Sequence, residues 1–425
     1  MPAQRVTEPP LVLAVNAGSS TLKFGLYPLS AGPQGWQALA PLISGCFEGL
    51  RDGERLRLLC SHRPAQLLPS PAKGQAMPTA LAELQALLKS LLGDLGGSHR
   101  LLAMAHRVVH GGDRYRSAVR VDAQVLEHLR AYEALAPLHQ AHNLEGLQAF
   151  SRQWPELPQI ACFDTAFHAD LPALETRFAL PRIEALAGVR RYGFHGLSYD
   201  YLSQCLARLS PRSRQPGSRA LLAHLGNGAS LCATRDGRSL ASSMGFSALD
   251  GLMMGSRCGS LDAGVLLHLL RQGWDGQALE DLLYRRSGLQ GVSGLSADLR
   301  QLRASDSEAA REAIALFGYR LRREAWALTG LLGGLDVLAF TGGIGEHDAP
   351  LRAELCESLA PLGLRLDEDA NARAGEAQRA RPIHAADSTA EIWVVPTDEG
   401  RVAAQQAACL LRLTGSAQPA DGGWA

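Results

Sequence analysis

The chain has 425 residues, of which 46% are hydrophobic, and its 42 Lys and Arg side chains balance 42 Asp and Glu side chains. This length predicts two or three domains. A net charge of zero leaves no basic field to attract nucleic acid or an anionic membrane, so the composition favours a small-molecule partner. No stretch has the apolar character of a signal peptide or the ~20 apolar residues of a membrane helix, so we expect a cytoplasmic protein.

The predicted elements begin with a β-hairpin whose turn is polar and contains glycine. A similar hairpin follows much later in the chain, so the two segments look like one unit used twice. The strand, turn and strand ranges are 11–15, 16–21 and 22–27 in the first copy, and 220–225, 226–230 and 231–234 in the second.

A second feature also occurs twice, as an apolar run that leads into a glycine-containing segment. Residues 101–105 lead into His106–Gly112, and residues 337–340 lead into Thr341–Glu346. Helices are predicted between these units at 79–92, 122–135, 143–152 with Asn143 as N-cap, 261–271 and 307–332. Residues 64–78 and 209–218 read as surface loops, and 414–425 as a frayed tail.

This mixed α/β order predicts two similar domains around a cleft, each opening with a hairpin whose turn can contact phosphate. The arrangement resembles the actin, sugar-kinase and Hsp70 fold, which is ribonuclease H-like. Known phosphate motifs are missing, because none of the three lysines lies in a GxxxxGK[ST] sequence and no HRD or DFG sequence occurs. Any ATP must be held by glycine-rich turns, polar side chains, arginine and metal.

Nine short segments together resemble the acetate kinase family, which also includes propionate kinases. The resemblance covers nearly the whole chain. The segments are Val15–Lys23, His106–Gly112, Ala136–His139, Cys162–His168, Arg191–Gly196, His224–Gly228, Met254–Gly259, Phe340–Glu346 and Pro396–Glu399.

The resemblance implies a reversible transfer of the γ-phosphoryl group of ATP to acetate, giving acetyl phosphate and ADP. It implies direct in-line transfer with Mg²⁺, for which Mn²⁺ can substitute, and a homodimer. It also implies an N-terminal acetate/propionate kinase domain of residues 1–165 completed by 399–425, and a nucleotide-binding domain of residues 166–398.

The resemblance assigns four catalytic residues. Arg107 and Arg257 would hold the carboxylate and the transferred phosphoryl group, and His195 would stabilise that group in flight. Asp164 would be the essential carboxylate. Because acetate is already an anion, we prefer that Asp164 orients an arginine or the metal shell rather than acting as a base, with an N-cap or turn role as the alternative.

The metal would be bound by Glu399 with Asn16 nearby, although Glu399 could also be an exposed carboxylate at the start of a helix. His106 and His110 have the spacing of a helical metal pair, but the strand-like sequence around them disfavours zinc. The substrate residues implied by the resemblance are Arg107, Val109, Leu138, His139 and Phe194. The nucleotide residues are Lys23, His224, Gly226, Asn227, Gly228, Asp298, Leu299, Arg300, Gly342, Gly343, Ile344 and Gly345.

Four residues depart from the family pattern, namely Ala248, Ser260, Leu299 and His347. Ala248 replaces a common proline and is expected to enlarge the substrate pocket, which keeps a propionate or other short-chain acyl kinase open as the alternative. A catalytically silent nucleotide-binding regulatory module is a further alternative, because fold alone does not establish activity. The complete set of Asn16, Arg107, Asp164, His195, Arg257 and Glu399 argues against it.

Overall fold

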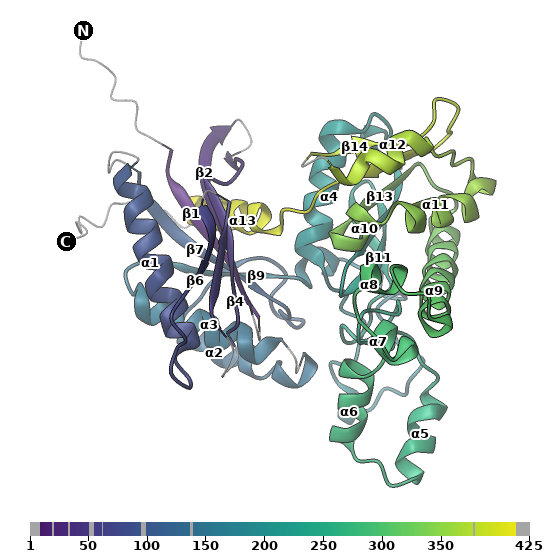
Figure 1. The fold of residues 1–425 in the computed structure, drawn as a ribbon, viewed down its shortest axis with the longest axis horizontal. Coiled ribbons are helices and arrows are strands. Elements are labelled where there is room, and N and C mark those ends of the chain that lie inside the picture. Colours follow the sequence, from purple (N-terminus) through teal and green to yellow (C-terminus); the bar gives the residue numbers. More distant parts are fainter. Residues whose placement is uncertain are drawn as a thin grey trace. The chain divides into compact units, whose positions relative to one another are not determined.

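The computed structural model describes residues 9–18, 21–32, 35–50, 55–61, 63–94, 99–136, 139–376 and 379–413. Within these residues the chain forms two compact units (Figure 1). The first unit runs up to Ala166 and resumes at Asp398, and the second comprises Phe167–Thr397. The chain passes between the two units at two points, and each point lies one residue from the domain boundary expected from the sequence.

The first unit is built on a sheet with the order β6-β5-β4-β2-β1-β7-β9-β8, and β3 pairs with β2 outside this path. Its strands are β1 (Leu11–Ala17), β2 (Thr21–Gly32), β3 (Gly35–Ala38), β4 (Ile43–Glu48), β5 (Arg57–Cys60), β6 (Arg63–Leu67), β7 (Leu101–Val108), β8 (Val119–Arg120) and β9 (Gln159–Phe163). Strands β1, β7 and β9 are parallel neighbours. Their carboxyl ends therefore meet at one edge of the sheet.

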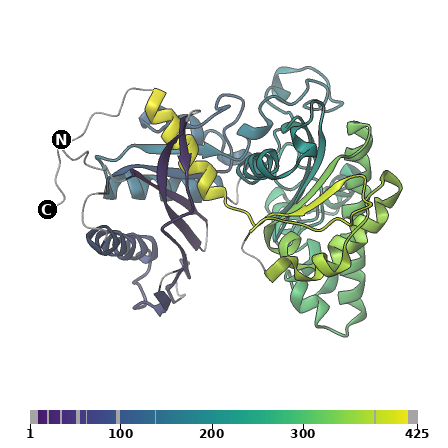
Figure 2. The same cartoon turned by 90° about the horizontal axis from the view of Figure 1, so that it is seen from above.

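Helices cover this sheet on both faces (Figure 2). The helices of this unit are α1 (Ala76–Asp94), α2 (Ala123–Arg130), α3 (Gln140–Gln153) and α13 (Glu399–Leu413). Leu13 and Val15 of β1 join a core with Leu84 of α1 and Phe150 of α3. On the opposite face, the Cys162 thiol of β9 lies 3.6 Å from the Ala403 carbonyl oxygen of α13. A strand buried on both faces explains the continuous apolar run of β1.

The second unit has the sheet order β12-β11-β10-β13-β15-β14. Its strands are β10 (Arg219–Leu225), β11 (Ala229–Arg235), β12 (Arg238–Ser242), β13 (Val337–Thr341), β14 (Arg381–Pro382) and β15 (Glu391–Val394). Its helices are α4 (Gly196–Leu209), α5 (Ala263–Arg271), α6 (Gly276–Arg285), α7 (Gly288–Ser293), α8 (Leu299–Arg303), α9 (Glu308–Leu332), α10 (Gly342–His347), α11 (Ala349–Ser358) and α12 (Glu368–Arg373). Tyr199 and Leu202 of α4 pack with Leu222 of β10 and Ala339 of β13.

The two sheets repeat one topology. Strands β4-β2-β1-β7-β9-β8 and β12-β11-β10-β13-β15-β14 follow the same order, with pairings that are antiparallel, antiparallel, parallel, parallel and antiparallel in both. The doubling predicted from the sequence is therefore confirmed.

Most predicted helices are present, with altered ends. Helix α9 follows Ser307 as predicted, whereas the segment predicted at 122–135 divides into α2 and a 3₁₀ turn at Glu133–Leu135. The N-cap prediction for Asn143 is wrong, because α3 begins three residues earlier. The loop predicted at 64–78 is also wrong in part, because it contains most of β6 and the start of α1. The side chains of β6 are all exposed, so no apolar alternation marks it. The tail predicted at 414–425 lies outside the described residues. No described helix is long and apolar enough to cross a bilayer.

Each unit buries a histidine that must stay neutral. In the first unit, His106 Nε2 donates to Gln159 Oε1 at 2.6 Å. In the second unit, His168 Nε2 donates to the Phe194 carbonyl oxygen at 2.9 Å, and its Nδ1 lies 2.8 Å from Ser239 Oγ. Burial lowers the pKa of both histidines from 6.5 to about 4. In the unfolded chain these rings would bind protons at a higher pH than in the folded protein.

We therefore predict that the free energy of unfolding falls as the pH drops from about 6.5 to about 4. In this window the unfolded state binds more protons, so stability rises with pH by at most about 1.4 kcal/mol per pH unit for each histidine. Denaturant unfolding at several pH values measures this slope, and His106→Gln and His168→Gln should each reduce it. A slope that neither substitution changes would contradict the prediction.

Candidate active site

In the first unit, three predicted site residues lie at the carboxyl ends of adjacent parallel strands. Asn16 is near the end of β1, Arg107 is near the end of β7, and Asp164 directly follows β9. Side chains alternate between the faces of a strand, so Asp164 shares the face of Cys162, which contacts α13. Asn16 follows the core residue Val15, so its side chain lies on the opposite face of the sheet. The first residue of α13 is Glu399, so strand order and alternation direct these polar groups toward one end of this helix.

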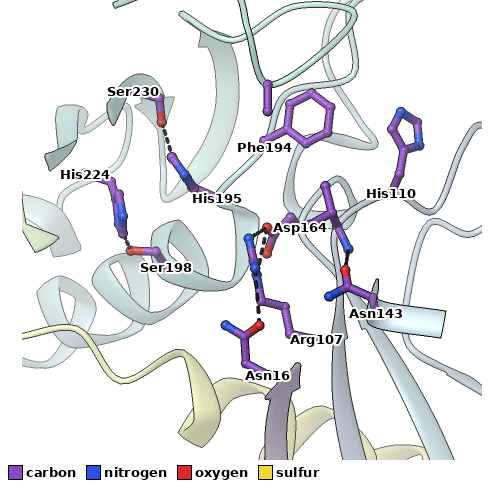
Figure 3. Close-up of polar contacts among 12 residues, drawn as sticks. Asn16, Arg107, His110, Asn143, Asp164, Phe194, His195, Ser198, His224 and Ser230 are labelled. Atoms are coloured by element: carbon purple, nitrogen blue, oxygen red, sulfur yellow. Dashed lines mark hydrogen bonds and ion pairs between the residues drawn. The ribbon is translucent and has the colours of Figure 1, made fainter. Parts of the chain in front are cut away.

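Arg107 and Asp164 form a largely buried ion pair (Figure 3). Arg107 Nε and Nη2 donate to Asp164 Oδ2 at 3.0 and 2.5 Å, and Nη1 lies 3.4 Å from Asn16 Oδ1. Burial alone would lower the pKa of the Arg107 guanidinium, but the neighbouring charges of Asp164 and Glu399 raise it above its usual value. The pair keeps a positive charge at the strand ends, as the orientation role that we prefer for Asp164 requires.

The donor set around Arg107 fits a hard divalent cation. Asn16 offers an amide oxygen, and Asp164 and Glu399 offer carboxylates that act on the same guanidinium. Among the residues described, no group of three His, Cys, Asp or Glu side chains is arranged to hold a metal ion. Magnesium usually takes only one or two protein carboxylates and completes its shell with water and substrate phosphates, so this sparse set suits it.

The other predicted substrate residues of the first unit lie beside Arg107 or outside the description. Val109 follows β7 and is buried. His139 immediately precedes α3. Leu138 lies outside the described residues. The zinc pairing of His106 and His110 is disfavoured further, because Gln159 holds the ring of His106 and His110 Nδ1 accepts the N–H of Gly112 at 2.8 Å.

In the second unit, His195 and His224 lie at the start of α4 and the end of β10. His195 has a left-handed backbone with φ of 58°, an uncommon conformation for a residue with a side chain. Its ring stacks on that of His224 with centroids 4.3 Å apart. His195 Nδ1 lies 2.8 Å from Ser230 Oγ, and His224 Nδ1 lies 2.8 Å from Ser198 Oγ (Figure 3). The sequence analysis did not identify Ser198 and Ser230 as site residues, because an isolated serine forms no recognisable motif.

The turn between β10 and β11 brings His195 and Arg257 together. A Cβ added to Gly228 would lie 2.9 Å from Arg257 Nη2 and 3.3 Å from His195 Nε2, so both side chains closely approach this turn. Arg257 Nη1 donates to the Ala248 carbonyl oxygen at 2.6 Å. The Asn227 carbonyl oxygen accepts the N–H of Gly255 at 3.0 Å, which ties the turn to the segment that carries Arg257.

A second glycine turn follows β13. Gly342 has φ of 80°, and a Cβ there would lie 2.6 Å from the Leu225 carbonyl oxygen, so only glycine fits. Glu346 Oε1 accepts the N–H groups of Gly342 at 2.9 Å and Thr397 at 3.1 Å. Gly343 is exposed, Ile344 is half-buried, and the Gly345 carbonyl oxygen accepts from buried Arg352 at 2.9 Å. Hydrogen bonds with Glu346 and Arg352 thus fix the turn, while Gly343 stays exposed.

The positions of the remaining predicted nucleotide residues do not by themselves indicate a nucleotide site. Asp298 caps α8 by accepting the N–H of Arg300 at 2.9 Å, and it also pairs with the guanidinium of Arg300 at 2.6 Å. Leu299 is buried. Lys23 is exposed on β2 of the first unit, opposite Asn16 in the hairpin register. The nucleotide roles of these four residues stay predictions.

Comparison with known proteins identifies the family. A model of the acetokinase family matches residues 11–405. The chain belongs to the acetokinase family. An acetate kinase of Rhodopseudomonas palustris is 47% identical and aligns over 92% of this chain and 95% of its own length.

Solved structures of this family agree with the fold. A propionate kinase from Francisella tularensis has a TM-score of 0.80 at 32% identity, covering 93% of this chain and 98% of its own. An acetate kinase from Porphyromonas gingivalis has a TM-score of 0.79 at 32% identity, covering 95% of this chain and all of its own. The fold is therefore the actin-like kinase fold expected from the sequence, and acetokinases are phosphotransferases with a carboxyl acceptor and ATP as a substrate.

We predict that Arg107→Ala and Asp164→Ala each destabilise the first unit, because each leaves a buried charge without its counter-ion. Arg107→Ala should cost about 3–5 kcal/mol, and Asp164→Ala less, because the guanidinium still reaches water. The double variant should lose less than the sum of the two. Urea unfolding measures these differences, with Arg300→Ala, which breaks an exposed pair and leaves the Asp298 cap of α8 in place, as the control expected to change little. Additive losses would contradict a coupled pair.

Proposed function

We propose that this acetokinase transfers the γ-phosphoryl group of ATP to acetate, reversibly, giving acetyl phosphate and ADP. The observation that carries the proposal is the buried Arg107–Asp164 pair at the carboxyl ends of parallel strands, beside Asn16 and the charge of Glu399. It supplies a fixed cation for an anionic acceptor and oxygen donors for a metal in one place. Phosphoryl transfer requires mainly such positioning and charge neutralisation.

Acetate needs no deprotonation, so no general base takes part. Arg107 binds the carboxylate of acetate through its planar guanidinium, and Asp164 fixes the orientation of that guanidinium from behind. An acetate oxygen then attacks the γ-phosphorus in line, the bond to the bridging oxygen of ADP breaks, and the electron pair of that bond remains on ADP. Arg257 neutralises charge on the equatorial oxygens, and His195 donates a hydrogen bond to one of them.

We propose that His195 takes this role in its Nε2–H tautomer. The Tyr199 hydroxyl lies 2.5 Å from Ser230 Oγ, which lies 2.8 Å from His195 Nδ1. When Tyr199 donates to Ser230, Ser230 can donate to His195 Nδ1. The neutral ring then keeps its proton on Nε2 and donates a hydrogen bond from there to a phosphoryl oxygen.

The family implies a divalent cation, and we propose Mg²⁺, with Mn²⁺ able to replace it. Glu399 and Asn16 would hold the ion by their oxygen atoms. When bound, the metal neutralises the charge of the phosphate oxygens and helps to align them. We propose that the first unit serves as the acetate/propionate kinase domain and the second as the nucleotide-binding domain, and that the protein acts in the cytoplasm.

Propionate is the alternative acceptor. Ala248 stands where the family commonly has proline, and its backbone carbonyl oxygen holds Arg257. One extra methylene in an apolar pocket changes the binding free energy by only ~1–3 kcal/mol, so a slightly larger pocket could admit propionate. We expect acetate to remain the better substrate, since the Rhodopseudomonas palustris relative, 47% identical to this chain, is named an acetate kinase. The silent regulatory module is disfavoured, because none of the six residues named for catalysis and metal binding is missing.

We predict that purified protein with ATP, Mg²⁺ and acetate forms an acyl phosphate, which hydroxylamine traps as a hydroxamate. Product should vanish without the metal, return with Mn²⁺, and form more slowly from propionate. Arg107→Ala and Arg257→Ala should each lower turnover by at least about 10²-fold, because positioned charge is lost from the reacting groups. Near-normal turnover in either variant would contradict the assigned roles. Absence of product with any short-chain acid, from folded protein that binds ATP, would favour the regulatory module instead.

We also propose a homodimer. Helix α9 offers apolar surface for such a contact, because it exposes Tyr319, Trp326 and Leu331 by 54%, 38% and 59%. We predict a sedimentation mass twice the 45.4 kDa of one chain at micromolar concentration, with Trp326→Glu shifting it toward one chain. A mass of one chain for the unaltered protein would contradict the proposal.

A further inference from the structure

The loop after β7 has an unusual hydrogen-bonding pattern. Its four consecutive backbone N–H groups, at Val109–Gly112, each donate to a side chain rather than to another backbone group. The acceptors are Asn143 Oδ1 at 3.0 Å, Gln140 Oε1 at 3.1 Å, Thr165 Oγ1 at 3.1 Å and His110 Nδ1 at 2.8 Å, in chain order. All four N–H groups are thus satisfied within the first unit, so the loop needs no ligand to hold its shape.

This pattern limits how the loop can meet a substrate. Backbone N–H groups that point into open space can form a nest for an anion. Here the N–H groups are already occupied, so the loop must bind through side chains. Arg107 lies in β7 two residues before Val109, a predicted substrate residue that opens the loop. The loop therefore holds the side chains of Arg107 and Val109 in fixed positions.

Asn143 on α3 joins this loop to the end of β1. While its Oδ1 accepts from Val109, its Nδ2 donates to the Ala17 carbonyl oxygen at 2.6 Å. Gln140 also donates, but to the carbonyl oxygens of His110 and Leu129. A donor on one side and an acceptor on the other fix which amide atom is oxygen. Ala17 is the last residue of β1 and directly follows Asn16. The side chain of Asn143 is 3% exposed, so water cannot replace either bond.

The backbone of α3 also approaches β1 closely at this point. A Cβ added to Gly146, one turn after Asn143, would lie 2.5 Å from the Cβ of Ala17. The helix therefore sits against the end of β1 with no space for adjustment. Both the amide of Asn143 and this packing fix α3 on the strand end that carries Asn16.

We propose that Asn143 is a positioning residue, which holds the metal-side residue Asn16 and the substrate loop at Val109 in one fixed relation. The inference rests on the proposed function, because Asn16 and Val109 have their roles there. Asn143 touches neither substrate nor metal in this account. It acts by keeping the ends of β1 and β7 in register, where a displacement of about 1 Å can cost about 10²-fold in rate.

The two contacts of Asn143 can be separated by substitution. Asn143→Asp keeps an acceptor for Val109 but loses the donor to Ala17, and places an oxygen against the Ala17 carbonyl oxygen. It should raise the Mg²⁺ concentration that gives half-maximal rate by about tenfold, and change the KM for acetate less than threefold. Asn143→Ala loses both contacts, so it should raise the KM for acetate as well and lower kcat by about 10²-fold.

Hydrogen–deuterium exchange gives a readout that does not depend on activity. In Asn143→Ala the amide of Val109 should exchange faster, and in Asn143→Asp it should stay protected. Gln159→Met is the matched control, because Gln159 is another buried amide of the first unit, bonded to His106 and to the Leu157 carbonyl oxygen at the amino end of β9. It should lower stability without changing the metal requirement or the exchange at Val109.

The outcomes distinguish this inference from the proposed function. The positioning role would be overturned if both Asn143 variants had the same kcat, KM and Mg²⁺ requirement as Gln159→Met at equal stability. Asn143 would then have a purely structural role. Equal metal requirements in Asn143→Asp and the unaltered protein would overturn the link to Asn16. An unaltered protein that makes no acyl phosphate would instead overturn the proposed function, while faster exchange at Val109 in Asn143→Ala alone would still support the loop clamp.

Discussion

The parallel pairing of β1, β7 and β9 is the constraint on which the first unit depends. The register places Val15 beside His106 and Arg107 beside Cys162. Because successive side chains alternate between the two faces, this register turns Arg107 toward the face of α13 and His106 into the core against Phe150. A slip of one residue in β7 would exchange them, burying a guanidinium among apolar side chains and moving a histidine to the site. The hydrophobic core and the site therefore specify the same register.

The second unit uses the same topology for different chemistry. Its hairpin ends in His224 and the Gly226–Gly228 turn, where the first unit has Asn16 at the corresponding strand end. His224 shares the face of Leu222, which packs on α4, and the start of α4 carries His195. A repeated sheet thus presents oxygen donors and an ion pair in one copy, and paired rings with glycine turns in the other. Topology sets where the groups lie, and residue type sets what they do.

The sequence was informative where a pattern extends over several residues. Apolar runs followed by glycine predicted the hairpins, and the 3.6-residue period predicted α9. Asn143 was misassigned because an asparagine before an apolar helix is a common N-cap, and only the fold reveals that its amide spans two strand ends. Asp298 and Leu299 show a different limit. Family resemblance predicts that they contact nucleotide, and this stays a prediction. The local structure shows only that Asp298 caps α8 and that Leu299 is buried.

The charge balance around Arg107 bears on how a substrate can enter. Asp164 takes both Nε and Nη2 through a single oxygen, Oδ2, and so occupies one side of the guanidinium. Among the residues that the structure describes, the Nη1 atom contacts only Asn16 Oδ1, at a long 3.4 Å. A carboxylate or phosphoryl oxygen can replace this weak contact at little cost, whereas displacing Asp164 would leave a buried carboxylate unpaired. In the proposed mechanism the ion pair would present Nη1 to the substrate, and Asn16, once released, would offer its amide oxygen to a metal ion. Binding of the acceptor and of the metal should therefore favour each other through this one shared contact.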